Sequence, residues 1–178
     1  MEAVFAQCFG HSSNTRLCGG FDEPLYRPVA APGQINELRY REDFFSSALH
    51  EASHWCIAGP ARRLQTDFGY WYAPDGRNRS QQSAFERVEY KPQALEWFFS
   101  RACGHRFRIS VDNLDACSIS DSADNGFELR VLAQARAWCE EGLPVDAGIF
   151  FVALCREFGT AHDLNALRFC VSELNSDR

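Results

Sequence analysis

Apolar residues recur at helical spacing in two long stretches of the chain. Between residues 45 and 59 they lie three or four positions apart, as one face of an α-helix requires. Asp43 is suited to cap the start of this helix, Gly59 can cap its end, and Pro60 cannot continue it. A second pattern covers 84–102, where Pro92 is expected to kink the helix or to begin a new one.

Shorter patterns predict the remaining elements. Further helices are expected at 3–9, 127–141, 147–158 and 163–173. Alternating apolar residues predict strands at 68–72 and 107–111, and Leu38 and Tyr40 indicate another. Polar or glycine-rich segments predict loops at 10–24, 77–83 and 112–126. The expected fold class is α+β: a single, mostly helical domain over 1–178 with a small sheet.

Composition narrows the class of protein. A chain of 178 residues, 46% of them hydrophobic, can bury a core without disulfides or structural metals. Its 18 basic and 24 acidic residues give a net charge of −6, which argues against a nucleic-acid partner. The chain has neither a run of 18 apolar residues nor a signal-like amino terminus, so no membrane association is expected. Its eight cysteines form no CxxC pair, which indicates reduced thiols in a cytoplasmic protein.

The strongest chemical signal is the motif His50-Glu51-Ala52-Ser53-His54, an HExxH sequence inside the predicted helix 45–59. Side chains at i and i+4 share a helix face, so both imidazoles can reach one metal ion. Glu51 points about 100° further round the helix. It can approach a water molecule or a substrate at the metal without being a ligand itself. The motif therefore predicts a metal site with Glu51 in a catalytic role.

A catalytic metal site commonly uses three protein ligands, so a third must come from elsewhere in the chain. Glu86 and Glu89 are the best candidates, because they are three residues apart on one face of the predicted helix 84–102. We favour Glu89 as the ligand and Glu86 as its outer partner or alternative. Gln93, one turn after Glu89, is a further candidate for an outer contact.

Two histidines and one carboxylate are compatible with two kinds of chemistry. With zinc they form a hydrolase site, such as that of a metallopeptidase or a metal-dependent ribonuclease, in which Glu51 acts as general base. With Fe(II) they form a facial triad that leaves positions for dioxygen and a substrate atom. The motif alone favours the zinc hydrolase. A domain whose metal is purely structural is a third possibility.

The residues around the motif resemble the elongation factor P hydroxylase family. Four blocks carry this resemblance, in the order and nearly the spacing of the family: Phe44–Gly59, Asp67–Arg77, Phe85–Leu95 and Val111–Leu114. The blocks cover about residues 5–115, and the resemblance is weak from 116 onward. Together they are specific, whereas HExxH alone is not.

The resemblance implies a function, a cofactor and a fold. Enzymes of this family hydroxylate the lysine of translation elongation factor P after it has been extended by a β-lysyl group. The family is similar to non-haem iron oxygenases with a two-histidine, one-carboxylate site, which implies Fe(II) and dioxygen here. The implied ligands are His50, His54 and Glu89. The implied fold is similar to a small ribosome-associated metal-dependent ribonuclease rather than to the jelly-roll oxygenases.

Residues near the motif are suited to such a substrate. A lysyl side chain carries ammonium groups, which Asp67 and Asp75 can receive through charge-assisted hydrogen bonds. Tyr70 and Tyr72 can supply apolar walls that keep bulk water away. These four residues are the predicted substrate-binding set.

Overall fold

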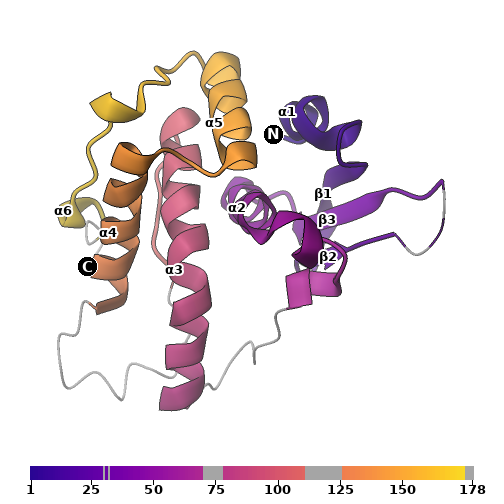
Figure 1. Ribbon diagram of the computed structural model, residues 1–178, viewed down its shortest axis with the longest axis horizontal. Helices are drawn as coiled ribbons and strands as arrows, with labels where there is room; N and C mark the ends of the chain where they lie inside the picture. Colours follow the sequence, from indigo (N-terminus) through magenta and orange to yellow (C-terminus); the bar gives the residue numbers. More distant parts are fainter. Residues whose placement is uncertain (30, 32, 70–77, 111–125, 175–178) are drawn as a thin grey trace.

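The computed structural model describes residues 1–174 except 30, 32, 70–77 and 111–125. The described part is mostly helical and includes one three-stranded sheet. Figure 1 shows helix α2 between the sheet on one side and helix α3 on the other. α3 packs against α2, α4 and α5, and α2 packs against β3. The predicted α+β class is confirmed at this level, and α2 occupies the centre of the molecule.

The sheet contains β1 (Thr15–Phe21), β2 (Leu25–Arg27) and β3 (Asn36–Arg41) in the order β1-β3-β2. β3 pairs parallel with β1 and antiparallel with β2. The predicted strand at Leu38 and Tyr40 is confirmed, but the loop prediction for 10–24 is wrong over β1. Gly19 favoured the loop prediction. In the structure, a Cβ atom added to Gly19 would lie 2.5 Å from the Tyr40 ring and would clash with it. This glycine reflects close packing within the sheet rather than a turn.

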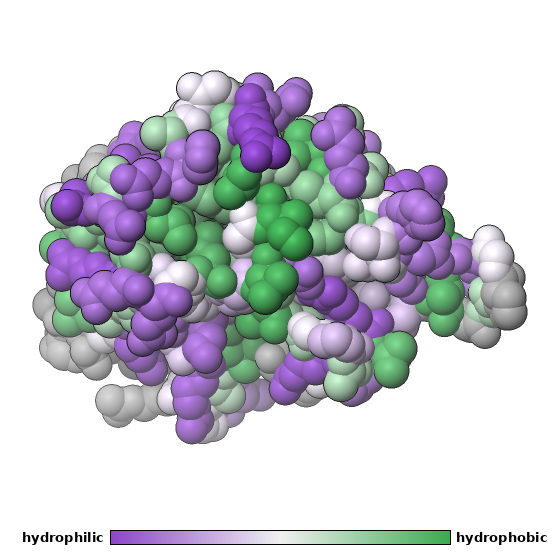
Figure 2. Space-filling model, turned by 45° about the horizontal axis from the view of Figure 1, so that its top comes forward, coloured by the Kyte–Doolittle hydropathy of each residue, from purple (hydrophilic) through white to green (hydrophobic). Residues whose placement is uncertain are grey.

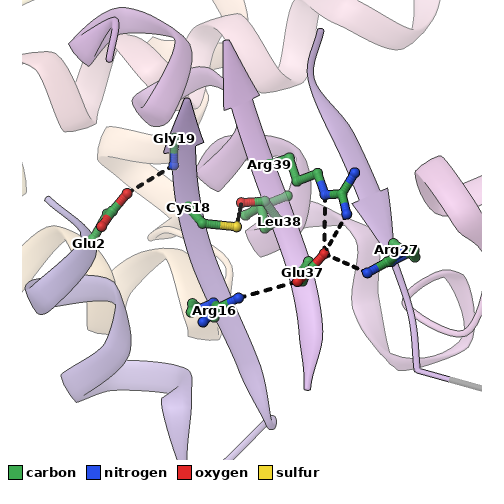
Figure 3. A network of polar contacts seen from close by, with 8 residues as sticks. All are labelled: Glu2, Arg16, Cys18, Gly19, Arg27, Glu37, Leu38 and Arg39. Atoms are coloured by element: carbon green, nitrogen blue, oxygen red, sulfur yellow. Dashed lines mark hydrogen bonds and ion pairs between the residues drawn. The ribbon is translucent and has the colours of Figure 1, made fainter. Parts of the chain in front are cut away.

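One carboxylate joins the three strands on the exposed side of the sheet. Glu37 lies between Arg16 of β1, Arg27 of β2 and Arg39 of its own strand (Figure 3). The nitrogen-oxygen distances are 3.2, 2.8 and 2.7 Å, respectively. The three arginines lower the pKa of Glu37, chiefly through the hydrogen bond from Arg39. Glu37 therefore ties the parallel and antiparallel pairings together on this side.

Helix α2 (Phe45–Arg62) confirms the predicted helix 45–59, with differences at both ends. Its N-cap is Phe44 rather than Asp43, which is exposed, and no side chain caps this end. Gly59 leaves the helical conformation with φ 69° and ψ 169°, as expected of a C-terminal glycine. Pro60 then opens one more turn that ends at Arg62, because proline is well tolerated at the start of a helical segment.

Helix α3 (Arg79–Ala102) is longer and more regular than expected. The side chain of Asn78 accepts a hydrogen bond from the backbone of Gln81, whose side chain accepts one from the backbone of Asn78. This capping box starts the helix early, so the loop prediction is wrong from residue 79 onward. Of the two alternatives expected at Pro92, a kink or a new helix, the new helix is wrong. One helix continues through it, and packing against α2, α4 and α5 supports this course.

Two predicted strands are not strands in the described residues. Thr66–Gly69 form a short 3-10 turn, so the prediction for 68–72 is wrong at its start, and the remainder lies outside the described residues. The segment 105–110 is irregular. The Gln93 amide receives the N–H of Ser110 at 3.0 Å and donates to its carbonyl at 2.7 Å. The Gln93 side chain therefore forms the hydrogen bonds to the backbone N–H and C=O of Ser110 that a neighbouring strand would form in a sheet.

The predictions for the terminal regions are mostly confirmed. The predicted helix 3–9 is present as α1 (Glu2–Phe5) continuing into a π-helical turn at Ala6–Gly10. α4 (Gly126–Glu141) and α5 (Val145–Phe158) confirm the helices expected at 127–141 and 147–158. The helix expected at 163–173 is wrong. Only short turns form there, at Leu164–Ala166 and in α6 (Val171–Leu174).

A single hydrophobic cluster extends from Val4 to Phe169, which supports the prediction of one domain. At its centre, Trp55 of α2 packs against Phe5 and Phe9, with ring centroids 5.2 and 4.5 Å apart. Figure 2 shows several apolar side chains gathered near the middle of the face that it draws. In α5, Val145 and Ile149 are exposed to solvent. Among the described helices, none combines the length and apolarity needed to cross a membrane.

Candidate metal centre

Helix α2 brings the two histidines of the motif together, as the i, i+4 spacing predicts. The Nε2 atoms of His50 and His54 are 3.1 Å apart. His54 is buried, and the His50 side chain is 24% exposed, so the pair lies at the edge of the core. Both histidines therefore present the same ring nitrogen to one point beside α3.

Helix α3 supplies Glu89, whose side chain is only 1% exposed, at the same point. One carboxylate oxygen lies 3.4 Å from His50 Nε2, and the other lies 3.3 Å from His54 Nε2. Ligand atoms about 2.1 Å from a common ion lie roughly 3.0–3.4 Å apart at octahedral or tetrahedral angles. The three residues offer ligand atoms within 4.8 Å of one another. The donor set and its spacing therefore fit one divalent metal ion.

Glu96 is part of this site, and the sequence analysis missed it. Its Oε2 lies 2.9 Å from Nδ1 of His50, on the side of the ring opposite the Nε2 atom that faces Glu89. Glu96 follows Glu89 by seven residues, which is two helical turns, so both carboxylates lie on the face of α3 toward α2. This i, i+7 spacing is the sequence signal that could have identified it.

The neighbouring carboxylates change the protonation of His50. Burial by itself lowers the pKa of His50, but the hydrogen bond and charge of Glu96 oppose this effect, as do the charges of Glu89 and Glu51. Together they raise its pKa to about 10. A proton and a metal ion compete for the same Nε2 lone pair. A metal ion must therefore displace this proton from Nε2 in order to bind, and the same negative charge that raises the pKa of His50 also attracts the cation.

Glu51 follows His50 on α2 and is half-buried. Burial is the main cause of its raised pKa, while the charges of His50 and His54 lower it. Glu89 and Asp67 raise it further, so Glu51 is within electrostatic range of the whole site. These features are compatible with the predicted catalytic role. Glu51 is not among the three residues that could hold the metal, which are His50, His54 and Glu89.

Asp67 lies in a left-handed turn close to His54. Asp67 and Phe68 have φ angles of 46° and 57°, values that are costly for residues other than glycine. Asp67 Oδ1 accepts the backbone N–H of Tyr26 at 2.8 Å, which holds this turn against β2. Phe68 stacks on the Tyr26 ring at 4.5 Å and lies parallel to the His54 ring at 6.4 Å. The turn thus provides an apolar wall beside His54, and Asp67 has a structural contact in addition to its predicted substrate role.

The other predicted residues are placed as follows. Glu86, one turn before Glu89, bonds to Arg130 of α4 at 2.5 Å and to Gln82 at 3.3 Å. The Gln93 amide holds the backbone of Ser110 through both of its ends. The cluster of possible ligands thus includes Glu89 and does not include Glu86. The predicted substrate residues Tyr70, Tyr72 and Asp75 lie outside the described residues.

An HExxH helix completed by a buried carboxylate from a second helix defines a class: small helical proteins with a candidate mononuclear site of two histidines and one carboxylate. Comparison with known families makes this class specific. The chain belongs to the elongation factor P hydroxylase family, whose model matches residues 4–169. The match extends through α4 and α5, beyond the range of about 5–115 that the sequence blocks cover.

A named relative supports the same assignment. The chain is 43% identical over 170 residues to the elongation factor P lysine hydroxylase of Haemophilus influenzae. The alignment covers 96% of this chain and 94% of the relative. The two proteins are therefore similar over nearly their whole lengths, including the helices that carry the candidate ligands.

Proposed function

We propose that this protein hydroxylates the β-lysylated lysine of translation elongation factor P with a metal ion held by His50, His54 and Glu89. The observation that carries the proposal is the convergence of these three side chains, within 4.8 Å, in a chain of the hydroxylase family. The family and the relative support the substrate and the reaction, and the donor set supports the metal.

We assign Fe(II) as the metal and zinc as the alternative. Two imidazoles and a carboxylate are the ligand set of non-haem Fe(II) oxygenases. Bound there, Fe(II) supplies the redox chemistry by which dioxygen hydroxylates an unactivated C–H bond. His50, His54 and Glu89 would bind it from one side, which leaves the opposite side for dioxygen and the substrate.

The surrounding residues are suited to a cationic side chain and a dry site. Phe68 lies parallel to the His54 ring with the ring centroids 6.4 Å apart, and both side chains are buried from water. Glu51 and Asp67 add negative charge close to the histidines. A β-lysyl-lysine carries ammonium groups, which such carboxylates attract and orient. We assign Tyr70, Tyr72 and Asp75 to the same substrate-binding set.

The proposed location is the cytoplasm. All seven cysteines in the described part of the chain are free thiols. Burial raises the pKa of Cys56 well above its usual value, so this thiol is neutral and unreactive. Free thiols of this kind persist in reducing compartments, where structural disulfides are rare.

The proposal is tested by the mass of elongation factor P. β-Lysylated elongation factor P is incubated with the Fe(II)-loaded protein, a reductant and dioxygen, and its peptides are analysed by mass spectrometry. We expect the modified lysine to gain the mass of one oxygen atom. The unmodified factor and an incubation without dioxygen are the controls. An unchanged mass with Fe(II) stoichiometrically bound would contradict the proposed function.

Glu51 distinguishes a hydroxylase from a zinc hydrolase. A hydrolase needs Glu51 to accept the proton of the attacking water, and loss of such a base typically costs about 10²–10⁴-fold in rate. Hydroxylation breaks a C–H bond without a general base, so Glu51 has at most an orienting or proton-steering role. We expect Glu51→Gln to retain bound metal and to lose less than about 100-fold of hydroxylation activity.

The measurement is oxygen incorporation into the modified lysine, with metal content determined on the same sample. Glu141→Gln, which changes a surface carboxylate on α4, is the control for the loss of one negative charge. Complete loss of activity with the metal fully retained would contradict this role for Glu51 and favour the hydrolase alternative.

A further inference from the structure

Glu96 stands out as a nearly buried carboxylate beside a proposed ligand. Its side chain is 9% exposed, and its Oε2 is 2.9 Å from His50 Nδ1. Burying a carboxylate costs free energy unless a charged or hydrogen-bonding partner compensates for it. For Glu96 that partner is the ring of His50. The contact also joins α2 to α3 across the site, because His50 lies on one helix and Glu96 on the other.

The contact determines which ring nitrogen of His50 keeps its proton when a metal ion displaces the other one. A carboxylate can only accept a hydrogen bond, so Nδ1 must carry the hydrogen that Glu96 receives. In a neutral imidazole the lone pair is then on Nε2. That atom is the one 3.1 Å from His54 Nε2 and 3.4 Å from Glu89. Glu96 thus selects the tautomer in which the donor atom of His50 faces the other two ligands.

We propose that Glu96 is a positioning residue of the metal site, one that holds the ring and the tautomer of His50. The inference rests on the metal site of the proposed function. Glu96 does not touch the metal. It orients its ligand and, by withdrawing the Nδ1 proton toward itself, makes Nε2 a stronger donor. With Glu89 and Glu51, it also adds to the negative charge around His50, which favours a bound divalent cation.

A purely structural role is the main alternative, in which the contact only tethers α2 to α3. The two roles differ in what they require of residue 96. A tether needs any hydrogen bond between the helices, whereas positioning needs an acceptor on Nδ1 and benefits from its negative charge. A glutamine retains the shape and one acceptor oxygen, and an alanine retains neither. Positioning therefore predicts a graded loss of metal affinity without a matching loss of folding.

The experiment measures Zn(II) binding to the full chain by calorimetry, since Zn(II) is redox-inactive and suited to the same ligands. Loss of an outer partner typically costs about 10–100-fold in affinity. We expect roughly 10-fold weaker binding for Glu96→Gln and about 100-fold for Glu96→Ala. Glu37→Gln is the matched control, because it also removes a carboxylate that joins elements, but on the exposed side of the sheet. It should change stability and leave Zn(II) affinity within about 2-fold of the unaltered protein.

A second measurement reports the tautomer directly. In the Zn(II)-loaded protein, the Nδ1 proton of His50 should give a downfield, slowly exchanging NMR resonance. We expect this resonance in the unaltered protein, a weaker one in Glu96→Gln and none in Glu96→Ala. Unchanged affinity and an unchanged resonance in either variant would overturn the proposal, and Glu96→Gln keeps the test decisive if Glu96→Ala does not fold. If the unaltered protein itself binds no divalent metal, the proposed function fails first, and the two failures are thereby distinguished.

Discussion

Replacement of His54 by alanine is expected to abolish both metal retention and hydroxylation. His54 contributes one of three converging ligand atoms, and Glu89 and His50 cannot complete the set without it. The loss of affinity should exceed the roughly 100-fold that removal of an outer partner costs. His50→Ala should have the same effect, with the added consequence that the nearly buried Glu96 loses its partner.

The fold should survive both substitutions. Alanine is the best helix former, so α2 should still form. Trp55 and the surrounding aromatic residues of the core do not depend on the ligands for their packing. The measurements are metal content per chain after dialysis, circular dichroism and oxygen incorporation into elongation factor P. His162→Ala, at an exposed histidine, is the matched control and should behave like the unaltered protein. Full activity in either ligand variant would show that the helix-face argument is wrong.

The second large effect concerns the carboxylate ligand. Glu89→Gln should lose the metal almost entirely, because an amide is a weak ligand and supplies no negative charge at this position, where the Glu89 side chain is only 1% exposed. Its amide NH₂ group would also be brought within about 3.5 Å of an imidazole nitrogen, in place of a carboxylate oxygen. The fold should remain, since glutamine has nearly the same shape as glutamate.

Glu86→Gln is the matched comparison, on the same helix and one turn away. Glu86 bonds to Arg130 and lies outside the ligand cluster, so its removal should leave most of the metal bound. The loss of the Arg130 contact should cost at most about 1 kcal/mol of stability, as is usual for a partly exposed ion pair. Metal titrations of the two variants under identical conditions decide the ligand. The reverse ranking would assign the third position to Glu86.

Local patterns in the sequence determined the helices that carry the site and the chemistry of two ligands. α2, α4 and α5 were predictable because apolar residues recur in each of them with the 3.6-residue period of an α-helix. This period can be recognised within each segment alone. The pairing of His50 with His54 was equally local, since four residues span about one turn of any α-helix. The start of α3 was predictable in principle, because Asn78 and Gln81 form a capping box three residues apart.

The remaining features depended on contacts between residues distant in the sequence. β1 forms because β3 supplies a parallel partner. Parallel strands are not joined by a short turn, so no local sequence signal predicts their pairing. The irregular course of 105–110 follows from the hydrogen bonds of the Gln93 amide to Ser110. The continuation of α3 through Pro92 is supported by packing against three other helices.

The site shows the same division. Sequence spacing placed Glu86 and Glu89 on one face of α3 and could only rank them. The way α3 packs against α2 directs Glu89 to the two Nε2 atoms and Glu96 to the opposite nitrogen of His50, while Glu86 turns to Arg130. Residues within one turn of a helix have positions fixed by backbone geometry, whereas a ligand set drawn from two helices is fixed only when their side chains pack together.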